Sequence, residues 1–218
     1  MPIDTNIKKF LKGSLIALLT IIAAVLCILL VGFFGDYFIS HPFDAPVDLT
    51  NSLSIDIIGA VIPAVAGLVS AALYLGYFKF PKMSLLPSLI ASVFLAFLLF
   101  RLTDLGVEGS PLLFSLLSSE VMVAFNTLPK PITQSKQKYI SFLLASVVCV
   151  PLSILSVDLF YASSFTNAII GGNGLSDAVL ISTLYAPLAA TLVYSILVYA
   201  MQIVWLIKYG LSISAKNT

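Results

Sequence analysis

Four acidic side chains lie inside or at the ends of long apolar runs of this 218-residue sequence, where a charged group is costly. They are Asp56, Glu120, Asp158 and Asp177. A carboxylate in such a position attracts a cation or a basic solute, takes up a proton, or shares a proton with a second carboxylate. We therefore treat all four as candidate binding residues, and Asp158 and Asp177 also as a candidate catalytic pair.

A glycine-rich segment, "AIIGGNGLSDAVL", precedes the last apolar run and contains one of these acids, Asp177. Its glycines permit positive φ angles or the close approach of another backbone. We add its polar and glycine positions to the candidate binding site: Gly171, Gly172, Asn173 and Gly174. In a simpler interpretation, Ser176 caps the final helix and Asp177 complements the helix dipole. That interpretation explains the acid but leaves the glycines unexplained.

The other reactive residue types form no familiar site. Cys27 and Cys149 lie in apolar runs without metal-binding spacing, and the single histidine, His41, lies in the proline-rich stretch "SHPFDAP". We find no Ser-His-Asp set, Cys/His cluster or phosphate-binding loop, so we predict no metal site and no cofactor. A basic patch with interleaved aromatic residues is also missing, which argues against nucleic acid as a partner.

The composition predicts an integral membrane protein. Hydrophobic residues make up 60% of the chain, charged residues 10%, and the mean hydropathy is +1.09, whereas soluble domains are about 25% charged. Because a bilayer core takes about 20 apolar residues per helix, we predict an all-α transmembrane helical bundle that forms one domain, residues 1–218. We expect about six spans, with a Gly-rich re-entrant or capping segment before the last helix. The predicted spans are 13–35, 54–77, 84–101, 111–128, 139–161 and 177–207.

The basic residues predict the orientation of this bundle. All lysines fall before the first span, after the second, after the fourth or after the last, which is one side of the membrane if there are six crossings. Only Arg101 falls on the other side. The positive-inside rule then gives a multi-pass protein of the cell membrane with both termini in the cytoplasm. Most acids fall on the outer side, where they create a negative field.

Helical periodicity predicts that Asp56 points into the bundle. Small or polar residues share one narrow face of the second span with it: Gly59, Pro63, Gly67 and Ser70. Such a face lets helices approach closely. The alternative is a packing face with a carboxylate that reaches out at its outer end.

In the fourth and in the sixth predicted span, polar residues also share one face of the helix. Ser115, Ser119 and Asn126 share one face, and Thr191, Ser195 and Gln202 share another; we expect interhelical hydrogen bonds from both. Glu120 lies off the serine face and well inside its span. We expect it to be protonated, paired with Arg101, or facing water.

Three segments resemble a family of prokaryotic multi-pass membrane proteins known only as a domain of unknown function. They are "SIDIIGAVIPAVAGLVSAALYL", "ILSVDLF" and "IIGGNGLSDAVLISTLYAPLAA", and they cover most of the chain from the second span onward. The family pattern has an Asn-x-Gly-Gly…Ile-Pro helix, a later Ala-Asp-Leu helix end and a Gly-Gly-Ala-Gly-x-x-Asp-Gly segment. The matching residues are Gly59, Ile62 and Pro63, then Asp158, then Gly171, Gly172, Gly174 and Asp177. Asp56 and Ala178 depart from the Asn and Gly of the pattern, and the resemblance implies no particular activity.

Three functions agree with these features. The first is a small transporter, channel-like or binding protein with an outward-facing, carboxylate-lined site for a cation or small solute, because broken backbone beside a helix is typical of transporter sites. The second is an intramembrane aspartyl protease that uses Asp158 and Asp177, since "GGNGLSD" followed by "YAPLAA" weakly resembles the Gly-x-Gly-Asp and Pro-Ala-Leu signatures of presenilin-like enzymes. The third is a structural or assembly subunit of a membrane complex. The lipid bilayer is a partner in all three, and assembly with copies of itself or with other chains stays open.

Overall fold

The computed structural model of the protein describes residues 5–40, 46–50, 53–77, 85–103, 106–127, 136–162, 168–171 and 177–214. These residues form an all-α helical bundle with small sheets at one end, which confirms the predicted fold class. Each predicted span corresponds to one helix. The helices are α1 (Thr5–Ser40), α2 (Ile62–Tyr77), α3 (Leu85–Leu99), α4 (Pro111–Thr127), α5 (Lys136–Ala162) and α6 (Ala178–Ser214), and a π-helical turn, η1 (Ile57–Val61), leads into α2.

Four of the described helical stretches are long and apolar enough to cross a membrane. They are Lys12–Phe33, Ile57–Gly76, Lys138–Ala162 and Ala178–Val204. α3 and α4 are apolar as well but shorter. Large apolar side chains such as Leu15, Leu29 and Phe33 of α1 are exposed on the surface of the bundle, as they are in proteins that face lipid.

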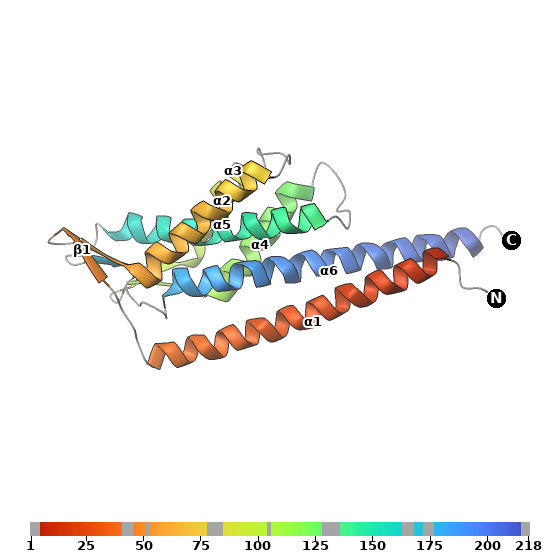
Figure 1. Ribbon diagram of the computed structural model, residues 1–218, viewed down its shortest axis with the longest axis horizontal. Helices are drawn as coiled ribbons and strands as arrows, with labels where there is room; N and C mark the ends of the chain where they lie inside the picture. The colour runs from red at the N-terminus through yellow and green to blue at the C-terminus, as the bar shows by residue number, and fades with distance from the viewer. Residues whose placement is uncertain are drawn as a thin grey trace.

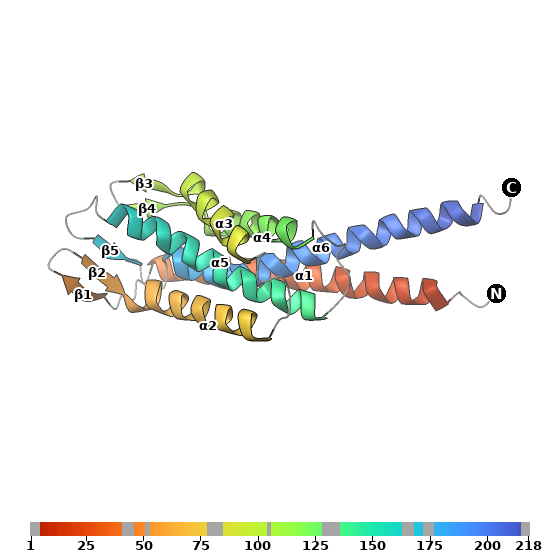
Figure 2. The same ribbon diagram turned by 90° about the horizontal axis from the view of Figure 1, so that it is seen from above.

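α6 is the central helix of the bundle. α1 runs antiparallel along one side of it, α4 and α5 pack against its other faces, and α2 and α3 pack against α5 (Figure 1). The first turns of α1 and the last turns of α6 lie at one end of the molecule, and the described strands lie at the other (Figure 2). α1 and α6 extend past the remaining helices toward the termini. We call the opposite end the strand-bearing end.

The strands were not predicted from the sequence. β1 (Pro46–Thr50) pairs antiparallel with β2 (Leu53–Asp56), and β2 pairs parallel with β5 (Ala168–Ile170), so that Ser54 lies opposite Ile169. β3 (Arg101–Thr103) and β4 (Gly106–Glu108) form a separate hairpin. The expectation that the second span is helical from residue 54 is therefore wrong for 54–56. Because β2 leads directly into η1 and β5 lies shortly before α6, their pairing brings the first turns of η1 and α6 together.

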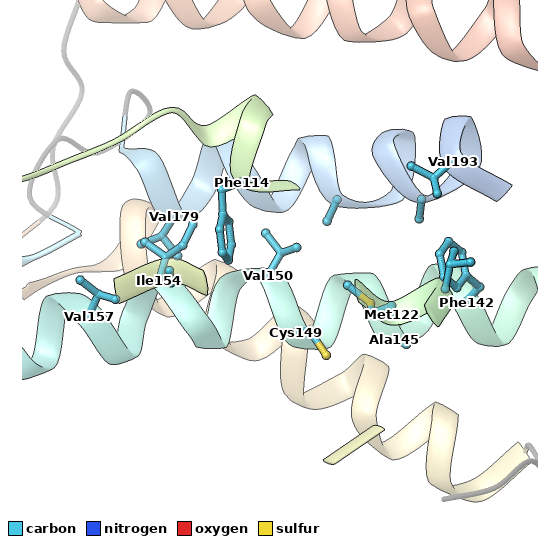
Figure 3. Packing of buried hydrophobic residues seen from close by; sticks show 14 of the residues in the cluster. Phe114, Met122, Phe142, Ala145, Cys149, Val150, Ile154, Val157, Val179 and Val193 are labelled. Atoms are coloured by element: carbon cyan, nitrogen blue, oxygen red, sulfur yellow. The ribbon is translucent and has the colours of Figure 1, made fainter. Parts of the chain in front are cut away.

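The apolar core lies between α4, α5 and α6 (Figure 3). α5 contributes a face on which most neighbours are three or four residues apart: Phe142, Ala145, Cys149, Val150, Ile154 and Val157. They pack against residues of α4 and α6 that include Phe114, Met122, Val179 and Val193. This spacing keeps one side of a helix turned toward its neighbours.

Interhelical hydrogen bonds hold the helices where the two polar faces were predicted. The Ser115 hydroxyl of α4 donates to the Ser182 carbonyl of α6 at 3.2 Å. Tyr139 of α5 and Thr191 of α6 share a hydrogen bond of 2.8 Å. Ser14 of α1 donates to the Gln202 side chain of α6 at 3.0 Å. Such bonds matter in lipid because apolar side chains gain little by leaving one apolar medium for another. Asn126 has no described side chain.

Candidate functional site

Asp56 is the N-cap residue of η1, the π-helical turn that begins the second span. Its Oδ1 atom accepts hydrogen bonds from the backbone N–H groups of Ile58 at 2.8 Å and Gly59 at 2.6 Å. The side chain is completely buried, at 0% exposure. The prediction that Asp56 points into the bundle is confirmed, and the alternative of a carboxylate that reaches out from the helix end is wrong. The cap satisfies N–H groups that lack partners within the helix.

The predicted face of the second span is buried along its whole length. Gly59, Pro63, Gly67 and Ser70 are all buried, and Tyr74 continues the face by one more turn. Neighbouring positions such as Ile62 and Val65 are exposed. The spacing of the small residues therefore predicted correctly which side of this helix is buried.

Asp177 begins α6 in the same manner. Its Oδ1 atom accepts from the backbone N–H of Val179 at 2.6 Å, and its carbonyl accepts from Ile181 N–H at 3.0 Å. The residue is 7% exposed. Asp177 itself thus makes the capping bond that the simpler interpretation gave to Ser176, a residue that lies outside the described part of the chain.

Gly59 and Gly171 bring the backbone of η1 into direct contact with the backbone that follows β5. A Cβ atom added at Gly59 would overlap the Gly171 carbonyl oxygen and lie 3.0 Å from the Cβ of Asp177. A Cβ added at Gly171 would lie 2.6 Å from the backbone nitrogen of Ala60, and the φ of Gly171 is 72°. Both positions therefore need glycine: Gly59 for space, and Gly171 for space and for its positive φ.

Asp158 approaches this contact from a third element. It lies four residues before the end of α5, is half-buried, and accepts a hydrogen bond from the backbone N–H of Gly171. The structure thus gathers Asp56, Gly59, Asp158, Gly171 and Asp177 at the strand-bearing end, and we call these five residues the Asp–Gly joint. Gly172, Asn173 and Gly174 lie outside the described residues.

The joint unites the three segments on which the family resemblance depends, although they are far apart in the sequence. The first segment supplies Asp56 and Gly59, the second Asp158, and the third Gly171 and Asp177. Gly59 was not among the residues predicted for the site. The signal that was available was its place on the same helical face as Asp56.

The carboxylates surround the glycine contact without converging on one point. Within the described residues, no group of three or more His, Cys, Asp or Glu side chains is arranged to hold a metal ion. Two helix N-termini, each equivalent to roughly half a positive charge, face the joint. Asp56 and Asp177 each cap one of these ends, and Asp158 is the third acid of the joint.

Glu120 is not part of the joint. It lies in the middle of α4 on an exposed face, while Ser115 and Ser119 on the other side of the helix are buried. In the described part of the chain no ion pair joins it to Arg101. That arginine is exposed in β3, directly across the hairpin from Glu108.

Comparisons of this chain with models of protein families, with curated proteins and with solved structures give no match. We therefore infer the function from the geometry and charge of the joint. Two described basic residues, Lys12 and Lys138, begin the apolar stretches of α1 and α5, whereas Asp158 lies near the other end of α5. The joint and Lys138 therefore lie toward opposite ends of α5.

Proposed function

We propose that this protein is a small transporter- or channel-like membrane protein that binds a small organic cation at the Asp–Gly joint. The observation that carries the proposal is the gathering of three aspartates, Asp56, Asp158 and Asp177, around the contact between Gly59 and Gly171. A carboxylate that is partly removed from water favours a positively charged group close to it. A positively charged solute would supply such a group at Asp158.

The arrangement of the carboxylates favours an organic cation over a metal ion. A metal ion needs ligands that converge on one point, whereas an ammonium or guanidinium group donates several hydrogen bonds in different directions. Asp56 and Asp177 are buried and hold the helix ends through their Oδ1 atoms. Asp158 is half-buried, so we assign it the direct contact with the solute.

The orientation of the protein follows from the positive-inside rule. In the sequence, lysines flank the helix ends that lie away from the strand-bearing end, so both termini would lie in the cytoplasm. The strand-bearing end and the joint would then face the outside of the cell. A solute would reach Asp158 from that side.

Uptake of radiolabelled guanidinium into proteoliposomes, driven by a membrane potential that is negative inside, tests this proposal. We expect uptake by the wild-type protein and its loss in Asp158→Asn, which removes the charge at nearly the same volume. Glu108→Gln is the matched control, because Glu108 is an exposed acid of the same end outside the joint. Equal uptake by the wild type and Asp158→Asn, or uptake no greater than by empty liposomes, would contradict the proposal.

An intramembrane aspartyl protease is the second candidate, and the position of two acids favours it. Asp158 is bonded to Gly171 and Asp177 adjoins Gly59, so the two acids adjoin the same glycine contact from the ends of consecutive helices. Two carboxyl groups that share a proton can activate water for peptide hydrolysis. Cleavage of a synthetic transmembrane peptide would have to disappear in both Asp158→Asn and Asp177→Asn. Cleavage that persists in either variant excludes this activity, and Asn at position 177 still caps the helix.

A further inference from the structure

Glu120 places a carboxylate on the outer surface of the bundle, halfway along an apolar helix. It is the tenth of the 17 residues of α4, about 13 Å along the axis from Pro111. Its side chain is exposed, and within the described residues nothing forms a hydrogen bond or ion pair with it. An ionised carboxylate that faces lipid near the centre of a span is unfavourable by roughly 2.5–3.5 kcal/mol.

The packing of α4 prevents Glu120 from turning inward. Ser118 on the opposite side shares a hydrogen bond of 2.7 Å with Ser92 of α3, and Ser115 donates to the Ser182 carbonyl of α6. Phe114 and Met122 are completely buried in the core. The rotation of α4 about its axis is therefore fixed on two sides, and Glu120 stays on the surface.

The residues around Glu120 form a surface that suits a second helix. One side of α4 carries four residues at successive spacings of four, three and four: Leu113, Leu117, Glu120 and Ala124. All four are exposed or half-buried. Ala124, a small residue one turn from Glu120, lets the backbone of another helix approach closely. We call Leu113, Leu117, Glu120 and Ala124 the α4 outer face.

The charge of Glu120 indicates what covers this face. None of the apolar stretches 13–35, 57–76, 85–99, 111–127, 139–162 and 178–207 contains a lysine or arginine. A second copy of the chain would therefore bring no positive charge to the depth of Glu120, and a symmetric pair would place like charges together. A different chain with a basic residue at the same depth would compensate the carboxylate.

We propose that the α4 outer face binds a transmembrane helix of another membrane protein, one that carries a lysine or arginine at the middle of its span. Glu120 pairs with that basic residue, and Ala124 admits the partner backbone. This inference is independent of the function proposed for the Asp–Gly joint, because Glu120 lies outside the joint.

Energy transfer in lipid vesicles tests the proposal with the full-length protein labelled at its C-terminus and with synthetic helices as probes. The probes are acceptor-labelled leucine-alanine helices of one length with a single central lysine, leucine or glutamate. We expect the lysine helix to bind the wild-type protein about tenfold more tightly than the leucine helix, which corresponds to 1.4 kcal/mol. Glu120→Gln should remove that difference and Glu108→Gln, an exposed acid outside the spans, should retain it. Glu120→Lys should reverse the preference in favour of the glutamate helix.

Three results would overturn the proposal. The lysine helix binding Glu120→Gln as tightly as the wild type would show that the charge is not recognised. The glutamate helix binding the wild type as tightly as the lysine helix would mean that a protonated Glu120 makes a neutral hydrogen bond instead. Self-association of the wild-type protein that disappears in Glu120→Gln would mean that a second copy covers the face.

Discussion

Replacing Gly59 with alanine should open the Asp–Gly joint, because the added methyl group has no space. Its Cβ would overlap the carbonyl oxygen of Gly171 and lie 2.9 Å from the carbonyl carbon. Both are backbone atoms, so no flexible side chain can move aside. Either η1 or the segment around Gly171 has to shift, and such a shift also disturbs the cap at Asp177, whose Cβ lies 3.0 Å from the same position.

The size of the effect follows from the cost of overpacking. An extra methyl group in a tightly packed interior costs about 1–3 kcal/mol, and partial loss of a helix cap adds about 1 kcal/mol. We therefore expect a loss of roughly 3 kcal/mol in the free energy of unfolding. For a chain of about this length, that corresponds to a decrease in Tm of roughly 6–12 °C.

Gly76→Ala is the matched control, since Gly76 is also in α2 but is exposed and has no atom within 4 Å of an added Cβ. Alanine there should leave Tm unchanged or raise it slightly, because alanine favours helix by up to about 1 kcal/mol. Thermal unfolding in detergent, followed by circular dichroism, measures both variants. If Gly59→Ala unfolds at the same temperature as the wild type, the direct contact between Gly59 and Gly171 does not exist and the reasoning is refuted.

Three more predictions concern the polar groups of the helices, and thermal unfolding of purified variants checks each. Asp177→Ala should lower the free energy of unfolding by about 1 kcal/mol, because the cap to Val179 is removed. Asp177→Asn should lower it much less, because asparagine caps as well as aspartate. Equal losses in the two variants would mean that the charge matters more than the cap. Ser182→Ala should leave the free energy of unfolding unchanged or raise it, since the Ser182 hydroxyl is fully buried without a hydrogen-bond partner among the described residues. An unmatched buried hydroxyl costs about 1–3 kcal/mol. A clear loss of stability in this variant would instead reveal a bound water. A double-mutant cycle with Ser14→Ala and Gln202→Leu should give a coupling of about 0.6 kcal/mol, and zero coupling would show that the hydrogen bond does not help to hold α1.

The helices were predictable because their signal is long and local. The apolar run predicted at 139–161 corresponds to α5 at Lys136–Ala162, and the one predicted at 111–128 corresponds to α4 at Pro111–Thr127. The burial of Asp56 followed from the spacing of small residues alone. Both the helix bounds and the burial of Asp56 depend on residues close together in the sequence, within a single helix.

The strands were missed because they are short, and the pairing of β5 with β2 is in addition not local. β5 has three residues and pairs with β2, more than a hundred positions earlier. The run "VDLTNSLSID" does alternate apolar and polar residues around an Asn-Ser pair, which is a hairpin signal. The contact between Gly59 and Gly171 depends on the pairing of these strands, so no pattern within either segment could show it.

The most direct test of the central claim is equilibrium dialysis of the detergent-solubilised protein against micromolar radiolabelled guanidinium. The claim is that the Asp–Gly joint binds a small organic cation through Asp158. We predict saturable binding to the wild type and to Glu108→Gln, and none to Asp158→Asn, with all three proteins unfolding at similar temperatures. Binding that is equal in Asp158→Asn, or a wild-type protein that retains no guanidinium, would contradict the claim.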